Sequence, residues 1–201
     1  MKKYQVILAS KSPRRREMLE ALGIKFKVIS ADADESSDIT DPAELVRNLS
    51  LRKAQAVREL MISRGELNED TLIIASDTVV VTDGEILGKP KDEEDAVRML
   101  TSLSGREHRV ISGVAVITGD RQGCDAEQTI VRFSALEHKD ILRYVESKEP
   151  MDKAGGYAVQ GTAALWIEGI VGDYHNVVGL PIYRLNCLLK DMLGIQLIDL
   201  K

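Results

Sequence analysis

The stretch Leu72-Ile-Ile-Ala-Ser-Asp-Thr-Val-Val-Val81 decides the fold, because seven of its ten residues are apolar. A short apolar run that ends at the turn residues Asp83-Gly84 predicts a buried strand. Asp77 interrupts this run, and a buried carboxylate is costly unless it is paired or bound to a metal. Asp77 is therefore our best candidate for a metal ligand or a general base. The alternative is an aspartate near the strand end that closes a turn or bonds the neighbouring backbone.

Apolar runs and helical periods alternate on both sides of this strand, which indicates an α/β fold. No repeat or linker divides the sequence, so we expect one domain over residues 1–201. Ser12 and Pro13 are typical of a helix start, and Gly23 of a helix end. We expect further strands at 4–9, 25–30, 110–118 and 128–133, a turn at 119–125, helices at 42–64, 92–103, 141–147 and 181–193, and short strands and turns over 153–181.

Composition excludes several classes of protein. The 27 Lys and Arg residues against 32 Asp and Glu give a net charge of −5. Such a chain should not coat nucleic acid or an anionic membrane, and 4% aromatic residues fit a nucleic-acid module poorly. No apolar run is long enough for a membrane span or a signal-peptide core, so we expect a cytoplasmic protein. Phosphate-loop, dinucleotide, zinc-protease and nucleophile-elbow motifs are absent from the sequence, which favours a metal-activated water over covalent catalysis.

Three arginines follow Ser12-Pro13, in the first turn of the predicted helix. The positive end of the helix dipole disfavours cations there by about 0.3–1 kcal/mol each. A bound anion would reverse this, because free backbone N–H groups, serine hydroxyls and guanidinium groups suit a triphosphate. The alternative is that Arg14 and Arg16 pair with Glu17 and Glu20 on a solvated face.

Four more residues carry open alternatives. Lys53 falls on the apolar stripe of the helix 42–64, so it either extends past the core edge or reaches a buried anion. Lys89 lies on a tight turn, and Glu35 in an acidic loop; each is an ordinary solvated residue unless phosphates or Mg²⁺ are bound nearby. Gln160 lies in a glycine-rich segment that either serves turns or lets the backbone approach a nucleobase.

Five segments together resemble the Maf family of nucleoside triphosphate pyrophosphatases. They occur in the family's order and are spread over residues 8–181: Leu8-Ala-Ser-Lys-Ser-Pro-Arg-Arg15, Ser76-Asp-Thr-Val-Val80, Gly88-Lys-Pro90, Asp152-Lys-Ala-Gly155 with Tyr157 and Gln160-Gly161, and Asn176-Val-Val-Gly-Leu-Pro181. The sequence departs from the family pattern at Ser76, where Ala or Gly is usual, and at Trp166, where Phe is common.

The resemblance implies an elongated mixed β-sheet with flanking helices that form two lobes around a cleft, similar to the inosine triphosphate pyrophosphatases. It implies cleavage between the α- and β-phosphates with a divalent metal, Mg²⁺ or Mn²⁺, and a homodimer. Asp77 would then accept the proton from water, and Glu35 with Asp77 would place the metal. The phosphates would be held by Ser10, Arg14, Arg15, Lys53 and Lys89. Base specificity would be set by Arg14, Thr78 and Gln160.

The Ser-Pro-Arg-Arg and Asp-Lys-Ala-Gly forms match the subfamily that resembles dTTP/UTP pyrophosphatases. We therefore expect a hydrolase acting on acid anhydrides that cleaves dTTP, UTP and modified pyrimidine triphosphates. Two alternatives remain open: a 7-methyl-GTP pyrophosphatase, and a non-catalytic nucleotide-binding regulator of septum formation. The presence of both Asp77 and Glu35 argues against the regulator.

Overall fold

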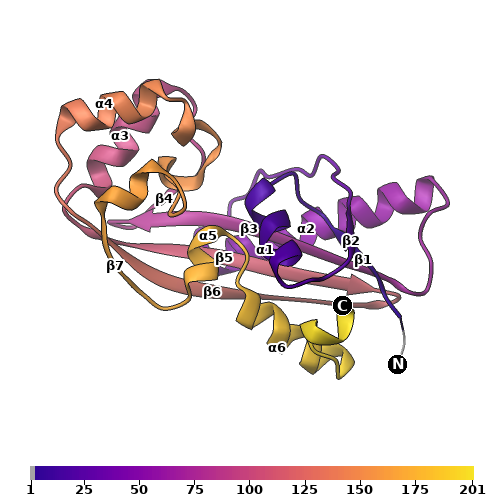
Figure 1. The fold of residues 1–201 in the computed structure, drawn as a ribbon. Helices are drawn as coiled ribbons and strands as arrows, with labels where there is room; N and C mark the ends of the chain where they lie inside the picture. The colour runs from indigo at the N-terminus through magenta and orange to yellow at the C-terminus, as the bar shows by residue number, and fades with distance from the viewer. Residues whose placement is uncertain (1–2) are drawn as a thin grey trace. The chain divides into compact units, whose positions relative to one another are not determined.

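A computed structural model describes residues 3–201, and its strands form one mixed sheet (Figure 1). Over this range the sheet has seven strands in the order β2-β1-β3-β5-β6-β7, and β4 pairs with β3. β1 is parallel to β2 and β3, whereas β4 is antiparallel to β3 and β7 to β6. The strands are β1 (Gln5–Leu8), β2 (Phe26–Val28), β3 (Thr71–Thr82), β4 (Glu85–Leu87), β5 (Glu107–Thr118), β6 (Arg121–Phe133) and β7 (Ile167–Val171).

The longer helices begin where the sequence places a capping residue or a proline. Asp41 caps α2 by accepting a 2.7 Å hydrogen bond from the Glu44 N–H, and Asp92 caps α3 in the same way. Ser12 precedes α1, with Pro13 as its first residue. The helices are α1 (Pro13–Ala21), α2 (Pro42–Ser63), α3 (Glu93–Leu103), α4 (His138–Glu146), α5 (Tyr174–Val178) and α6 (Ile182–Leu193).

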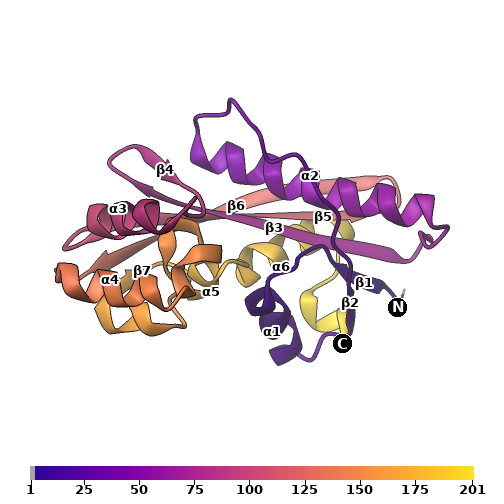
Figure 2. The ribbon, with the colours of Figure 1, turned by 90° about the horizontal axis from the view of Figure 1, so that it is seen from above.

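The chain forms two compact units, and β3, β5 and β6 contribute residues to both. Unit 1 comprises Met1–Asp77, Ser112–Glu127 and Gly179–Lys201, and unit 2 comprises Thr78–Ile111 and Gln128–Val178. In unit 1, α2 covers one face of the sheet, and α1 and α6 lie on the other face (Figure 2). In unit 2, α3 and α4 pack together over buried apolar side chains of β3, β5 and β6.

Helix α2 approaches the sheet very closely at Gly113 of β5. A Cβ atom at this position would lie 2.1 Å from the carbonyl oxygen of Val46 in α2. The buried side chains Ala54, Val57 and Met61 of α2 then pack on the sheet, in a cluster that includes Ile73. This packing fixes the helix that carries Lys53 against the strand that carries Asp77.

The structure corrects two predictions of local structure and adds one element. The turn predicted at 119–125 is confined to residues 119–120, because β6 already begins at Arg121. Residues 153–181 contain one strand, β7; the rest is mainly short helices, since Gly155 and Gly156 adopt positive φ angles of 68° and 73° that end regular extended structure. A last 3-10 helix, Leu197–Leu200, was not predicted.

Among residues 3–201, no helix has the length and apolar character that crossing a membrane requires.

Candidate functional site

Two carboxylates and one lysine converge in unit 1. The Lys53 ammonium group lies 2.8 Å from Oε1 of Glu35 and forms an ion pair with Oδ1 of Asp77. Lys53 comes from α2, Asp77 from β3, and Glu35 from the loop between β2 and α2. The Asp77 side chain is 12% exposed, whereas that of Glu35 is 60% exposed. The prediction that a buried Asp77 must be paired is confirmed, and so is the alternative that Lys53 reaches a buried anion.

Asp77 sits on a backbone that is itself bonded on several sides. Ser76, which precedes it, is fully buried, and its hydroxyl lies 2.7 Å from the Gly113 carbonyl oxygen and 2.8 Å from that of Gly179. The hydroxyl of Ser76 therefore connects β3 to β5 and to the segment before α6. Its buried polar atom is satisfied within the protein, as such atoms usually are.

The loop that carries Glu35 is attached to α2 through Arg52. The Arg52 guanidinium donates to the backbone carbonyls of Asp34, at 3.3 Å, and Ser36, at 2.8 Å, on either side of Glu35. The Asp34 side chain accepts hydrogen bonds from both the N–H and the hydroxyl of Ser36, and these bonds lower the pKa of Asp34. Sequence reasoning missed Arg52, although its place next to Lys53 was a usable signal.

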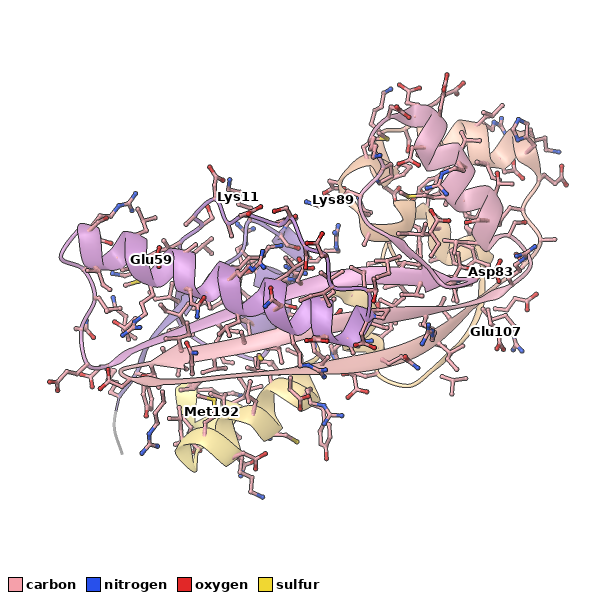
Figure 3. All side chains as sticks on the ribbon, turned by 180° about the vertical axis from the view of Figure 1, so that it is seen from behind. Lys11, Glu59, Asp83, Lys89, Glu107 and Met192 are labelled. Carbon is pink, nitrogen blue, oxygen red and sulfur yellow. The ribbon has the colours of Figure 1, made fainter. Side chains whose placement is uncertain are left out.

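The arginines of the basic turn at the start of α1 have different surroundings. Arg16 pairs with Glu20 at 3.4 Å on the exposed face. For this residue the structure therefore confirms the alternative to anion binding, an ion pair on a solvated face. Arg14 is partly buried, and among residues 3–201 its side chain makes no hydrogen bond or ion pair. Lys11, which precedes the helix (Figure 3), pairs with the exposed Asp32 at 3.5 Å. Arg14 is thus a cation whose N–H groups can meet a ligand.

Arg15 and Ser10 are engaged with each other and with the backbone of unit 1. Arg15 donates to the carbonyl oxygens of Gly179 and Ser76, and its Nη1 lies 3.4 Å from the Ser10 hydroxyl. Ser10 is buried, and its hydroxyl also accepts from the Ser12 N–H at 3.1 Å. Both residues lie at the basic turn, and their predicted role in phosphate binding stays a prediction.

The other predicted residues, Thr78, Lys89 and Gln160, belong to unit 2. Lys89 is exposed on the turn after β4 (Figure 3), and Gly88 before it accepts a 2.9 Å hydrogen bond from the Gly155 N–H. Gln160 is exposed, while Thr78 follows Asp77 directly on β3. The structure brings six predicted residues together in unit 1, and the part that these three take in the site stays a prediction.

A carboxylate holds the segment next to Gln160. Glu149 accepts hydrogen bonds from the Thr162 N–H at 3.1 Å and from the Thr162 hydroxyl at 2.8 Å. A Cβ atom at Gly161 would lie 1.9 Å from a Glu149 carboxylate oxygen, so a larger residue there would displace this side chain. Lys153 of the Asp-Lys-Ala-Gly segment donates to the Glu149 backbone carbonyl. Sequence reasoning gave Glu149 no role.

The carboxylates around Lys53 are potential ligands of a metal ion. Among residues 3–201 no three His, Cys, Asp or Glu side chains cluster in a way that could hold one. Mg²⁺, however, is usually bound by one or two carboxylates together with substrate phosphates. Glu35 and Asp77 already converge on one cation, the Lys53 ammonium group. These two carboxylates therefore fit a metal ion that is completed by a phosphate ligand.

Comparisons with known proteins find relatives over most of the chain. A family model described as "Maf-like protein" matches residues 5–192. A "dTTP/UTP pyrophosphatase" from Symbiobacterium thermophilum is 50% identical over 181 residues, covering 90% of each chain. One of the same name from Caldanaerobacter subterraneus subsp. tengcongensis is 45% identical and covers 96% of this chain and 91% of its own.

A solved structure shares the fold at much lower identity. The Ham1 protein of Staphylococcus aureus is 14% identical, with a TM-score of 0.52 over 93% of this chain and 98% of that chain. The predicted α/β fold with a mixed sheet is confirmed.

Proposed function

The chain belongs to the Maf family, and from this premise we propose that it is a nucleoside triphosphate pyrophosphatase that hydrolyses dTTP and UTP. The products are the nucleoside monophosphate and pyrophosphate. The names of its relatives support both the reaction and the substrates. The enzyme would be a hydrolase acting on acid anhydrides.

The pairing of Asp77 with Lys53 carries this proposal. A carboxylate held in a mostly buried strand beside a cation is kept in a fixed direction, as a general base requires. Asp77 accepts a proton from the water that attacks the α-phosphorus, while the bond to the pyrophosphate leaving group breaks. Lys53, which already faces this carboxylate, also supplies positive charge for the charge that develops on the phosphates.

The remaining phosphate contacts are assigned by position in the chain. Arg14 and Ser10 lie at the N-terminal end of α1, where backbone N–H groups favour an anion. Lys89 is the further cation, supported by its exposure on the turn after β4 and by the family resemblance. We leave Arg15 out of this set, since its guanidinium group bonds two backbone carbonyls.

We propose that Glu35 and Asp77 hold a divalent metal ion, Mg²⁺ or Mn²⁺, when the triphosphate is bound. The metal would neutralise phosphate charge and make the bridging oxygen a better leaving group. Glu35 is suited to this, because Arg52 fixes the carbonyls on both sides of it. Loss of turnover on chelation, with recovery on adding Mg²⁺ or Mn²⁺, is the expected result.

For base specificity we propose Arg14, Thr78 and Gln160. The alternative substrate is 7-methyl-GTP, and a panel of purified triphosphates with a pyrophosphate readout separates the two. A preference for 7-methyl-GTP over dTTP and UTP would overturn our choice.

The test of the mechanism is Asp77→Asn, which keeps the shape of the side chain but removes its basicity. We expect turnover to fall at least about 100-fold while nucleotide binding is retained, because general-base catalysis contributes factors of this size. Near-wild-type turnover would show that the base is assigned wrongly. Nucleotide binding without metal-dependent hydrolysis in the wild type would favour the regulator. A homodimer, which the resemblance implies, is proposed as well, and light scattering after gel filtration tests it.

A further inference from the structure

Arg15 is the second of the three arginines in the basic turn, and its side chain contacts the backbone of two distant segments. Its Nε donates to the Gly179 carbonyl oxygen at 2.7 Å, and its Nη1 donates to the Ser76 carbonyl oxygen at 2.8 Å. These partners are 164 and 61 positions away in the sequence. One guanidinium group therefore ties α1 to the strand β3 and to the segment before α6, all within unit 1.

The carbonyl that Arg15 holds belongs to the peptide group that joins Ser76 to Asp77. The same peptide segment is held from the other side, since the Ser76 hydroxyl lies 2.8 Å from the Gly179 carbonyl oxygen that Arg15 also contacts. A planar guanidinium group donates in fixed directions, so the bond from Nη1 to the Ser76 carbonyl oxygen restrains the orientation of this peptide group, while the bond from Nε to Gly179 holds the guanidinium group in place. The Cα atom of Asp77 is part of that plane.

We infer that Arg15 is a positioning residue for Asp77, and that phosphate binding at the basic turn falls to Arg14. The inference rests on the proposed function for its meaning in catalysis. The Arg14 side chain makes no hydrogen bond or ion pair among residues 3–201, whereas that of Arg15 has two backbone acceptors. Turning Arg15 toward a phosphate would break both bonds, and the Gly179 carbonyl oxygen would keep only the Ser76 hydroxyl as a neighbouring donor.

The charges around Arg15 agree with this assignment. Burial lowers the pKa of Arg15, and the nearby Asp77 carboxylate acts in the opposite direction. The guanidinium group nevertheless stays protonated, as arginine does in proteins. Arg15 thus provides a permanent positive charge behind the proposed base, in a place set by the backbone.

The positioning role predicts a split between kcat and KM. Misplacing a reacting group by about 1 Å can cost 100-fold in rate without weakening substrate binding. Arg15→Gln should therefore lower kcat by about 10- to 100-fold and leave KM within about threefold. Arg14→Gln, the matched control one residue away, should raise KM by about tenfold and change kcat little, because it removes a phosphate contact that is present before the transition state.

The experiment measures both variants and the wild type in three ways. These are steady-state turnover of dTTP with Mg²⁺, calorimetric binding of inorganic pyrophosphate, and amide hydrogen exchange over residues 72–81. We expect Arg15→Gln to keep its pyrophosphate affinity and to lose protection at these residues by about tenfold, consistent with local opening. Arg14→Gln should show the reverse pattern. If Arg15→Gln weakens pyrophosphate binding as much as Arg14→Gln does, the inference is overturned.

Two further outcomes keep the test decisive. If Arg15→Gln does not fold, Arg15→Lys retains the charge but lacks the planar fork of donors that binds both carbonyls. A fall in kcat then supports positioning, and wild-type kcat overturns it. If the wild type hydrolyses no triphosphate, the proposed function fails, while pyrophosphate binding and hydrogen exchange still judge Arg15.

Discussion

The two ion pairs of Lys53 should differ in strength, because they share one ammonium group but not one environment. At an effective dielectric constant of about 20, unit charges 4 Å apart attract by roughly 4 kcal/mol before ordering and screening are subtracted. The Asp77 side chain is 12% exposed and that of Glu35 is 60% exposed. We expect a coupling energy of about 2 kcal/mol for Lys53–Asp77 and about 0.5 kcal/mol for Lys53–Glu35.

Double-mutant cycles measure both couplings on one protein. The variants are Lys53→Met, Asp77→Asn, Glu35→Gln and the two double variants with Lys53→Met. Urea unfolding followed by far-UV circular dichroism gives the free energy of unfolding of each one. The three residues lie in unit 1, so both cycles report on the same compact part of the chain.

High salt provides a control, because it should weaken the exposed ion pair more than the buried one. At 1 M NaCl the Debye length is about 3 Å, so the exposed Glu35 pair should lose most of its coupling. The Asp77 pair should keep about half of its coupling or more, because water and ions screen it less. Equal couplings at low salt, or a stronger Glu35 pair, would refute the reasoning that burial decides the strength of these contacts.

Three further predictions concern packing, pH and specificity. Gly113→Ala places a methyl group 2.1 Å from the Val46 carbonyl oxygen, so the free energy of unfolding should fall by about 3 kcal/mol; an unchanged urea midpoint would contradict the close approach of α2. Burial lowers the pKa of His108 from 6.5 to about 4, so the unfolded chain binds this proton first. Stability should fall by up to about 3 kcal/mol as the pH drops from 6.5 to 4, and a His108→Phe variant with the same decline would assign the effect to other groups. Glu149→Ala removes the acceptor beside Gln160 and should reduce the preference for dTTP over GTP about fivefold in kcat/KM, the equivalent of one hydrogen bond; an unchanged ratio would separate Glu149 from specificity.

Much of the fold is readable from local sequence. The apolar run around Asp77 predicts the central strand, and the helix starts predicted at Pro13, Pro42 and Asp92 lie within one residue of those in the structure. Strands and helix starts depend on the backbone preferences of neighbouring residues and on capping residues a few positions away, and both can be read directly from the sequence. The glycine-rich region is less readable, since positive φ angles at Gly155 and Gly156 replace strands with turns and short helices.

The sequence by itself also determined which residues were out of place. Asp77 in an apolar strand and Lys53 on an apolar helix face each required a partner, because burying an unpaired charge is costly. The sequence could not say that they are each other's partner, 24 positions apart. Nor could the sequence distinguish the roles of Arg14 and Arg15, which are adjacent and chemically identical. Only the tertiary structure decides this, because it brings Gly179 to Arg15 across 164 positions and leaves Arg14 without such an acceptor among the described residues.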